Sequence, residues 1–341
     1  MKILVGLSGG LDSTYTAYKL IKEGHTVEGL VLVMHDYTDV EGAKKTAELL
    51  GIKLHTLDCR ELFKKHVISN FISEYSLGHT PNPCTVCNRY VKISELCRFA
   101  NENGFDKAAT GHYARIIFDD ETQRYCIAKG NDERKDQSYM LWYLTQEQLK
   151  TLYFPLCDIT KEQIREEIKL TEFAYLADAK ESQEICFIPD NDYASYIEKE
   201  RGTFPEGDFI DSEGKVVGKH KGIIHYTIGQ RKGLGISLGA PAYITKIDPE
   251  NNTVTVEKQS DVKADTLRAN SLNSQLLLAD DGQEYTLDVK IRYAAKPMSA
   301  NVKIENGIAT VVFNEPVRAI TPGQSAVFYK DDKIAFGGTI I

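Results

Sequence analysis

Two segments of the chain combine residue types and spacings that can do chemistry. The first is the hexapeptide SGGLDS at residues 8–13, which lies between a short apolar run and a helical pattern. Backbone N–H groups at a helix N-terminus are unpaired and partly positive, and glycines allow close approach to an anion. The hydroxyls of Ser8 and Ser13 add donors. This segment predicts a phosphate site, although no Gly-Lys-Ser/Thr closes it as a Walker A loop.

The second feature is a set of cysteines. Cys84 and Cys87 lie in the sequence PNPCTVCN at 81–88, which predicts a loop, and Cys186 lies in ESQEICFI at 181–188. A CxxC pair can be half of a zinc site, but no second CxxC or CxxH completes one. It can also be a redox pair, but the thioredoxin-type context is missing. We expect the other four cysteines to be small buried hydrophobes: Cys59, Cys97, Cys126 and Cys157.

The first third of the chain alternates strand and helix patterns. Strands are expected at 3–7, 26–34 and 53–57, with helices at 12–23 and 40–50 that end at Gly24 and Gly51. Such an order predicts the α/β class with a doubly wound parallel sheet, which residues 107–110 join as a further strand.

After about residue 190 the sequence pattern changes from alternating strands and helices to short β-type runs. Short β-type runs occur at 222–228, 242–247 and 253–257, with a strong turn signal at 248–252. Later runs at 286–293, 298–304, 308–313 and 326–329 predict a small β-barrel. We therefore divide the chain into an α/β domain with the predicted phosphate loop and the cysteines (1–197), a mostly β central domain (198–260) and a C-terminal β-barrel domain (261–341).

Composition bounds the class of protein. The chain has 341 residues, 42% of them hydrophobic and 26% charged, which is ordinary for a soluble globular protein of two or three domains. No run approaches the ~20 apolar residues of a membrane helix, and the N-terminus does not resemble a signal peptide. A cytoplasmic protein is expected. The net charge of −8 requires that any nucleic-acid site be a local basic patch.

The motifs resemble those of a known family. The hexapeptide at 8–13 resembles the pyrophosphate loop of enzymes that cut ATP between its α and β phosphates. Together with the cysteines, further blocks resemble the tRNA 2-thiouridylase family along the whole chain: ATGHYAR at 109–115, KDQSY at 135–139, HYTIGQRKGLGI at 225–236 and TPGQS at 321–325.

The resemblance implies a reaction. ATP, with Mg²⁺, adenylates the C2 oxygen of the wobble uridine (position 34) of tRNA, and sulfur from a cysteine persulfide then replaces that oxygen while AMP leaves. Cys87 matches the family's first catalytic cysteine and Cys186 the cysteine that carries the persulfide. In one version of the mechanism the two form a disulfide bond that must be reduced. Thiolates suit such chemistry because they are strong nucleophiles.

The resemblance also implies binding residues and partners. Asp12 is expected to organise Mg²⁺ and the pyrophosphate. The expected partners are tRNAs for Lys, Glu and Gln, and a sulfur donor that is a cysteine desulfurase or a sulfur-relay protein. The implied ATP contacts are Gly6, Leu7, Ser8, Gly9, Gly10, Leu11, Asp12, Ser13, Met34 and Gly111. The implied tRNA contacts are Asn82, Pro83, Cys84, His112, Lys135, Asp136, Gln137, Arg292, Tyr293 and Gln324.

The sequence departs from the family pattern at two places. Many relatives have aspartate where this chain has Cys84. As an alternative to the persulfide mechanism, the three thiols of Cys84, Cys87 and Cys186 can together hold a [4Fe–4S] cluster that binds sulfide. The connection that follows Met34 is also shorter than usual.

Three other readings stay open. One is an amidating ligase with the same kind of ATP loop, which leaves Cys186 unexplained. Another is a different tRNA thiolase. The third is a non-catalytic RNA- or nucleotide-binding descendant, which predicts decay of the loop or of the cysteines, whereas both are intact.

Overall fold

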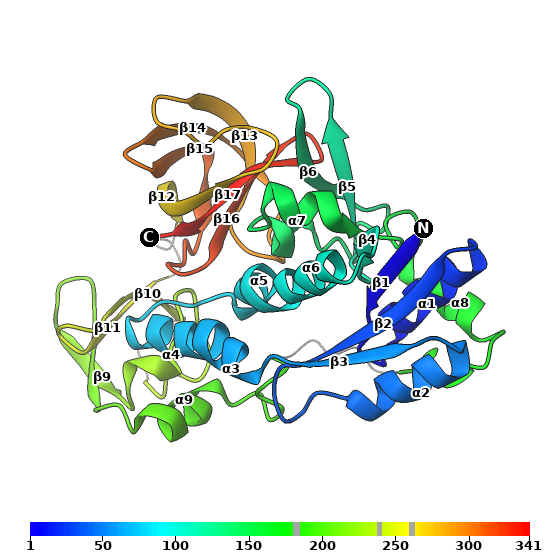
Figure 1. The fold of residues 1–341 in the computed structure, drawn as a ribbon. Coiled ribbons are helices and arrows are strands. Elements are labelled where there is room, and N and C mark those ends of the chain that lie inside the picture. The colour runs from blue at the N-terminus through cyan, green and yellow to red at the C-terminus, as the bar shows by residue number, and fades with distance from the viewer. Residues whose placement is uncertain (180–184, 237–240, 259–262) are drawn as a thin grey trace.

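The computed structural model describes residues 1–179, 185–236, 241–258 and 263–341, and Figure 1 shows their arrangement. The predicted parallel sheet is confirmed. Its strand order is β3-β2-β1-β4-β7, and every neighbouring pair runs parallel. The strands are β1 (Lys2–Gly6), β2 (Thr26–Val33), β3 (Leu54–Asp58), β4 (Lys107–Ala109) and β7 (Leu152–Tyr153).

Helices cover both faces of this sheet because apolar side chains alternate along β1. Ile3 and Val5 pack with α1 (Leu11–Lys22) and α2 (Val40–Leu50). Leu4 faces the other side, in the core that contains α3 (Arg60–Phe63), α4 (Ser69–Ser76) and α6 (Ile93–Glu102). The side chain of Asp39 caps α2, and Gly51 ends it with a φ of +65°. The sheet is therefore doubly wound, as the sequence predicts.

The segment with Cys84 and Cys87 is helical, so the expected loop is wrong. Helix α5 (Pro83–Cys87) continues through a π-helical turn (η2, Asn88–Lys92) into α6. Asn82 is the N-cap, its side chain accepts a hydrogen bond from the Thr85 N–H, and Pro83 occupies the first helical position. The Pro-Asn-Pro sequence that suggests a turn is here the start of a helix.

The C-terminal domain is the small barrel that the strand spacing predicts. Strands β12-β15-β14-β13-β16-β17 are neighbours in that order, and a further β12–β17 pairing closes the ring. The barrel strands are β12 (Lys263–Ser274), β13 (Glu284–Lys290), β14 (Met298–Glu305), β15 (Ile308–Arg318), β16 (Ser325–Lys330) and β17 (Lys333–Ile340).

A hairpin of the N-terminal domain extends the barrel sheet. Strands β5 (Ala114–Asp119) and β6 (Arg124–Lys129) pair with each other, and β6 pairs with β17. Fully buried Gln275 fixes this junction, since its side chain accepts from the Ile127 N–H and donates to the Leu141 and Trp142 carbonyls. The barrel and the α/β domain therefore share a sheet and a buried polar seam.

The central domain is a four-stranded sheet of order β10-β11-β8-β9. The turn predicted at 248–252 joins β10 and β11. The strand predicted at 222–228 is wrong, because Gly222 has a φ of +115° and Ile223–His225 form a 3₁₀ turn. The boundary proposed at 197/198 lies inside α9, and the one at 260/261 lies outside the described residues. The strands are β8 (Gly207–Ile210), β9 (Val216–His220), β10 (Ala242–Asp248) and β11 (Thr253–Lys258), and the remaining helices are α7 (Gln146–Thr151), α8 (Lys161–Ile168) and α9 (Tyr193–Arg201).

Candidate active site

The phosphate loop joins β1 to α1 at the carboxyl edge of the parallel sheet. Gly9 has a φ of +76°, and a Cβ there would lie 2.6 Å from the backbone of Gly42 in α2, so only glycine fits. Helix α1 begins at Gly10 with no side-chain cap. The loop therefore presents an uncapped helix N-terminus, which is the arrangement that favours a bound phosphate.

Two hydroxyls hold this loop in shape. The Ser8 and Ser13 hydroxyls are 3.0 Å apart and hydrogen-bonded, Ser13 Oγ accepts from the Ser8 N–H, and it donates to the Gly10 carbonyl. Leu7 and Leu11 are buried beneath the loop. The segment expected to contact ATP, from Gly6 to Ser13, is thus one continuous and internally braced turn.

The Asp12 carboxylate accepts a hydrogen bond from a tyrosine and forms an ion pair with a lysine. The Tyr113 hydroxyl donates to its Oδ1 at 2.7 Å, and Lys161 Nζ lies 2.9 Å from its Oδ2. Gly111 backs directly onto this residue, because a Cβ on it would lie 2.9 Å from Asp12 Cβ. Mg²⁺ is commonly held by one or two carboxylates together with substrate phosphates, and this role of Asp12 stays a prediction. Sequence reasoning missed Lys161, which lies 149 residues away along the chain.

We predict that Lys161→Met weakens ATP binding about tenfold while leaving the fold intact. The variant keeps most of the apolar stem but removes the positive charge beside the phosphate loop, and a charge-assisted contact contributes about 1.5–3 kcal/mol. Isothermal titration with ATP measures this. The exposed Lys44, which pairs with Glu41 on α2, supplies the matched control Lys44→Met. Equal affinities for the two variants would show that Lys161 plays no part in nucleotide binding.

Met34 connects the loop region to the cysteines. It follows β2 at the carboxyl edge of the sheet, and its sulfur lies 3.8 Å from Cys87 Sγ. On the other side of α5, the Asn82 amide contacts the Met140 sulfur and the Asn88 amide donates to the Met140 carbonyl. The structure therefore brings Met34, an expected ATP contact, against Cys87.

The pKa values of the three thiols depend on burial and on neighbouring charges. Burial raises the pKa of Cys87 to about 12, and the charges of Cys186 and Cys84 raise it further, while Lys92 lowers it. Burial also raises the pKa of Cys84 and of Cys186, although both side chains are accessible to solvent, and Lys92 again acts in the opposite direction. Burial in this conformation therefore disfavours the thiolate form of all three cysteines.

Lys92 is a second residue that sequence reasoning missed. It lies on the π-helical turn five residues after Cys87, and its charge acts on all three thiols and on His112. Its position close to Cys87 becomes evident only once residues 83–92 are known to be helical. Its charge lowers the pKa of each of the three thiols and therefore favours a thiolate here.

The cluster alternative, with Cys84, Cys87 and Cys186 as ligands, stays a prediction. Within residues 1–179, 185–236, 241–258 and 263–341, no three His, Cys, Asp or Glu side chains converge to hold a metal ion, and this range includes Cys84, Cys87 and Cys186. No step below is therefore assigned to an iron–sulfur cluster.

Among the expected tRNA contacts of the N-terminal domain, His112 and Asp136 are buried, Cys84 is exposed and the others are partly buried. His112 is 9% exposed, and its Nδ1 is 2.7 Å from the Thr110 hydroxyl. Asp136 is buried and accepts from Ser138, and the Gln137 side chain accepts from the Tyr113 N–H. Lys135 lies beside them, partly buried. This group links the ATP loop to the barrel, because Ser138 also bonds the Tyr329 hydroxyl.

Burial lowers the pKa of His112 to about 3, and this gives a prediction about stability. The unfolded chain binds a proton near pH 6.5, whereas the folded chain does not, so the contribution of neutral His112 is complete above pH 6.5 and is lost as the pH falls towards 3. Between pH 7.5 and pH 5.5 the wild type should lose about 1.4 kcal/mol through this residue. His112→Gln should lack that loss in urea unfolding. An identical pH dependence for the two proteins would contradict the assignment.

The expected contacts in the barrel lie where the domains meet. Arg292 donates to the carbonyls of Arg318 and Ala319. Tyr293 is 41% exposed, lies near Tyr139, and has Lys290 over its ring. Gln324 reaches the segment before α5 and donates to the Thr80 carbonyl at 2.7 Å. Tyr293 is thus the most accessible of these three side chains to a partner.

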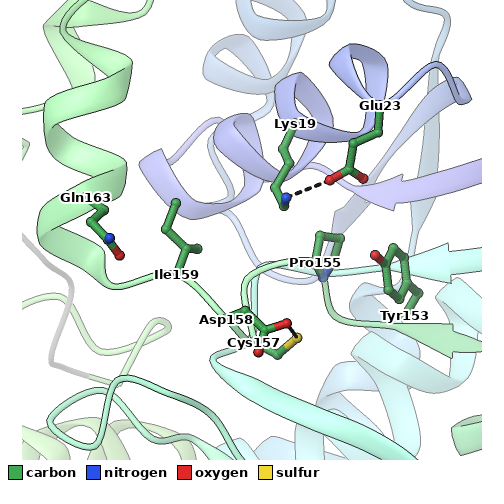
Figure 2. Close-up of a pocket in the computed structure, with 8 residues that line it drawn as sticks. All are labelled: Lys19, Glu23, Tyr153, Pro155, Cys157, Asp158, Ile159 and Gln163. Atoms are coloured by element: carbon green, nitrogen blue, oxygen red, sulfur yellow. Dashed lines mark hydrogen bonds and ion pairs between the residues drawn. The ribbon is translucent and has the colours of Figure 1, made fainter.

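A separate hollow lies away from these residues. Figure 2 shows it beside α1 and the segment after β7, where Lys19 pairs with Glu23. Its volume is about 440 Å³, and none of the residues that we expect to bind ATP or tRNA lines it: the lining is Lys19, Glu23, Tyr153, Pro155, Cys157, Asp158, Ile159 and Gln163.

Among the described helices, none is both long enough and apolar enough to span a bilayer.

Comparison with known proteins assigns the family. Three family models match the chain: a tRNA methyl transferase HUP domain at residues 1–190, a tRNA methyl transferase PRC-barrel domain at 194–258 and an aminomethyltransferase beta-barrel domain at 264–341. A solved structure of the U34-tRNA thiolase NcsA from Methanococcus maripaludis with its [4Fe-4S] cluster is 20% identical, covering 59% of this chain and 67% of that one. Its TM-score is 0.35, too low for its cluster or substrate to be carried over.

Two relatives cover almost the whole chain. The tRNA-specific 2-thiouridylase MnmA of Carboxydothermus hydrogenoformans is 44% identical over 99% of this chain and 97% of its own length. The tRNA-specific 2-thiouridylase MnmA 1 of Caldanaerobacter subterraneus subsp. tengcongensis is 45% identical over the same shares. With this identity from end to end, the chain belongs to the tRNA-specific 2-thiouridylase family.

Proposed function

We propose that this protein is an ATP-dependent tRNA-uridine 2-sulfurtransferase that acts on the wobble uridine (position 34). The observation that carries this proposal is the contact of Cys87 with Met34, at the same sheet edge as the phosphate loop. A thiol beside a nucleotide site suits a reaction in which adenylation and sulfur transfer act on one carbon atom. Methyl transfer, which the family description mentions, leaves both the loop and the thiols unexplained.

The first step adenylates the base. The C2 oxygen of the uridine attacks the α phosphate, the bond between the α phosphate and the bridging oxygen breaks, and pyrophosphate leaves. Backbone N–H groups of the loop and Lys161 stabilise the charge that builds on the departing pyrophosphate. Mg²⁺ held by Asp12 would neutralise phosphate charge. The uridine must leave the stacked anticodon loop to reach this edge.

The second step transfers sulfur. The terminal sulfur of a Cys186 persulfide attacks C2, the C2–O bond breaks, and AMP leaves with the oxygen. The Cys87 thiolate then attacks Cys186 Sγ and breaks its bond to the transferred sulfur, which stays on the base as the 2-thio group. A Cys87–Cys186 disulfide remains, and an external thiol reduces it by two electrons. Lys92 stabilises the thiolate that Cys87 must form.

An assay in vitro separates the two steps. Purified protein, unmodified tRNA and labelled ATP are incubated with a cysteine desulfurase, and both pyrophosphate and 2-thiouridine are measured. Wild type should form both. Cys186→Ser should release pyrophosphate once per bound tRNA and form no 2-thiouridine. If Cys186→Ser makes 2-thiouridine as fast as wild type, Cys186 does not carry the sulfur.

A further inference from the structure

A loop of the barrel, residues 321–324, is hydrogen-bonded to the segment that leads into α5, which carries Cys84 and Cys87 and is called the cysteine helix below. The Gln324 side-chain amide donates to the Thr80 carbonyl at 2.7 Å and lies 3.5 Å from the Pro81 carbonyl. In return, the Thr80 N–H donates to the Pro322 carbonyl at 2.9 Å. Both backbone polar groups of Thr80 are therefore bonded to the barrel, across more than 240 residues of sequence.

The loop itself is firmly part of the barrel. The Gly323 N–H donates to the Ile340 carbonyl at 2.9 Å, and the Ile340 N–H donates to the Gln324 carbonyl at 2.8 Å. Gly323 has a φ of +87°, and a Cβ on it would lie 3.0 Å from His79 Cβ and 3.1 Å from the Thr80 backbone. Only glycine allows the two chains to approach this closely.

Little chain separates this contact from the thiols. Asn82 alone stands between Pro81 and the first residue of α5, and its side chain caps the helix through Thr85. Pro81 and Pro83 restrict the backbone on either side. A shift of Thr80 must therefore move the start of α5, where Cys84 lies, and with it Cys87.

We propose that Gln324 is a positioning residue that fixes the cysteine helix from the barrel. This proposal rests on the function proposed above. The amide that the family resemblance assigns to tRNA already donates to Thr80. Through this contact, the barrel is coupled to the position of Cys84 and Cys87.

Two variants and one control test this. Gln324→Ala removes the donor, and Gln324→Glu places a carboxylate against two carbonyl oxygens, so its effect should be larger. The control is Gln283→Ala, an exposed barrel glutamine whose side chain contacts only the Tyr285 hydroxyl among the described residues. Hydrogen exchange is measured on the protein alone, and tRNA affinity and the rate of thiolation are measured separately.

For both Gln324 variants we expect amides of residues 80–87 to exchange about five- to tenfold faster, with exchange elsewhere in the barrel unchanged. The kcat for thiolation should fall about tenfold while tRNA affinity stays within twofold of wild type. Unchanged exchange at 80–87, or a tenfold loss of tRNA affinity with an unchanged kcat, would overturn the proposal. Absence of thiolation by the wild type would overturn the proposed function alone, because the exchange readout needs neither tRNA nor ATP.

Discussion

Replacing Gly9 with alanine is expected to lower the free energy of unfolding by about 2–5 kcal/mol and to weaken ATP binding at least tenfold. The φ of +76° is unfavourable for any residue with a Cβ, and that Cβ would lie 2.6–2.9 Å from three backbone atoms of α2. These atoms cannot rotate away as a flexible side chain can. The loop and the start of α2 must therefore move apart, which opens the phosphate site.

The neighbouring glycine supplies the control. A Cβ on Gly10 would meet only Ser8 Oγ, at 3.6 Å, and the φ of −84° there suits any residue. Gly10→Ala should therefore unfold at the same urea concentration as wild type. Urea unfolding and titration with ATP measure both effects. Equal stability of the two alanine variants would contradict the observed approach of the loop to α2.

Replacing Cys87 with serine is expected to reduce the formation of 2-thiouridine about 10³-fold while pyrophosphate release continues. In the proposed mechanism, serine cannot cleave the bond between Cys186 and the transferred sulfur, so AMP leaves but the base stays joined to Cys186 through that sulfur and free 2-thiouridine is not released. Rapid-quench measurement of pyrophosphate and 2-thiouridine in a single turnover distinguishes the two steps.

Cys97 provides a matched control on the same continuous helix. It is 5% exposed, and burial raises its pKa to about 12, as for Cys87. It lies on α6, ten residues from Cys87, within the core of the α/β domain. Cys97→Ser should retain sulfur transfer within about threefold. If both variants lost activity equally, general destabilisation of the helix, and not the chemistry of Cys87, would explain the result.

The parts of the fold that sequence predicted are those with local signals. Apolar runs of strand length, glycines at 24 and 51, and the hexapeptide at 8–13 each act within a few residues, and β1, β2, α1 and α2 follow from them. The barrel strands β13, β14, β15 and β16 were likewise predicted from short β-type runs and their spacing, whereas β12 and β17 were not predicted.

The parts that sequence missed depend on distant contacts or on competing local signals. Lys161 meets Asp12, and β6 meets β17, only after the chain has folded. At residues 81–88 two prolines indicate a turn, whereas the Asn82 cap and Pro83 begin a helix. Because that helix was not predicted, the position of Lys92 near the thiols was not predicted either.

The most direct test of the central claim is mass spectrometry of tRNA nucleosides from cells that lack this protein and every other thiouridylase of the family. Complementation with wild type should restore 2-thiouridine derivatives at the wobble position, and complementation with Cys186→Ser should restore none, because the proposed mechanism assigns the persulfide to that cysteine. Restoration to the wild-type level by Cys186→Ser would contradict the persulfide route. Failure of the wild type to restore any 2-thiouridine would contradict the proposed function itself.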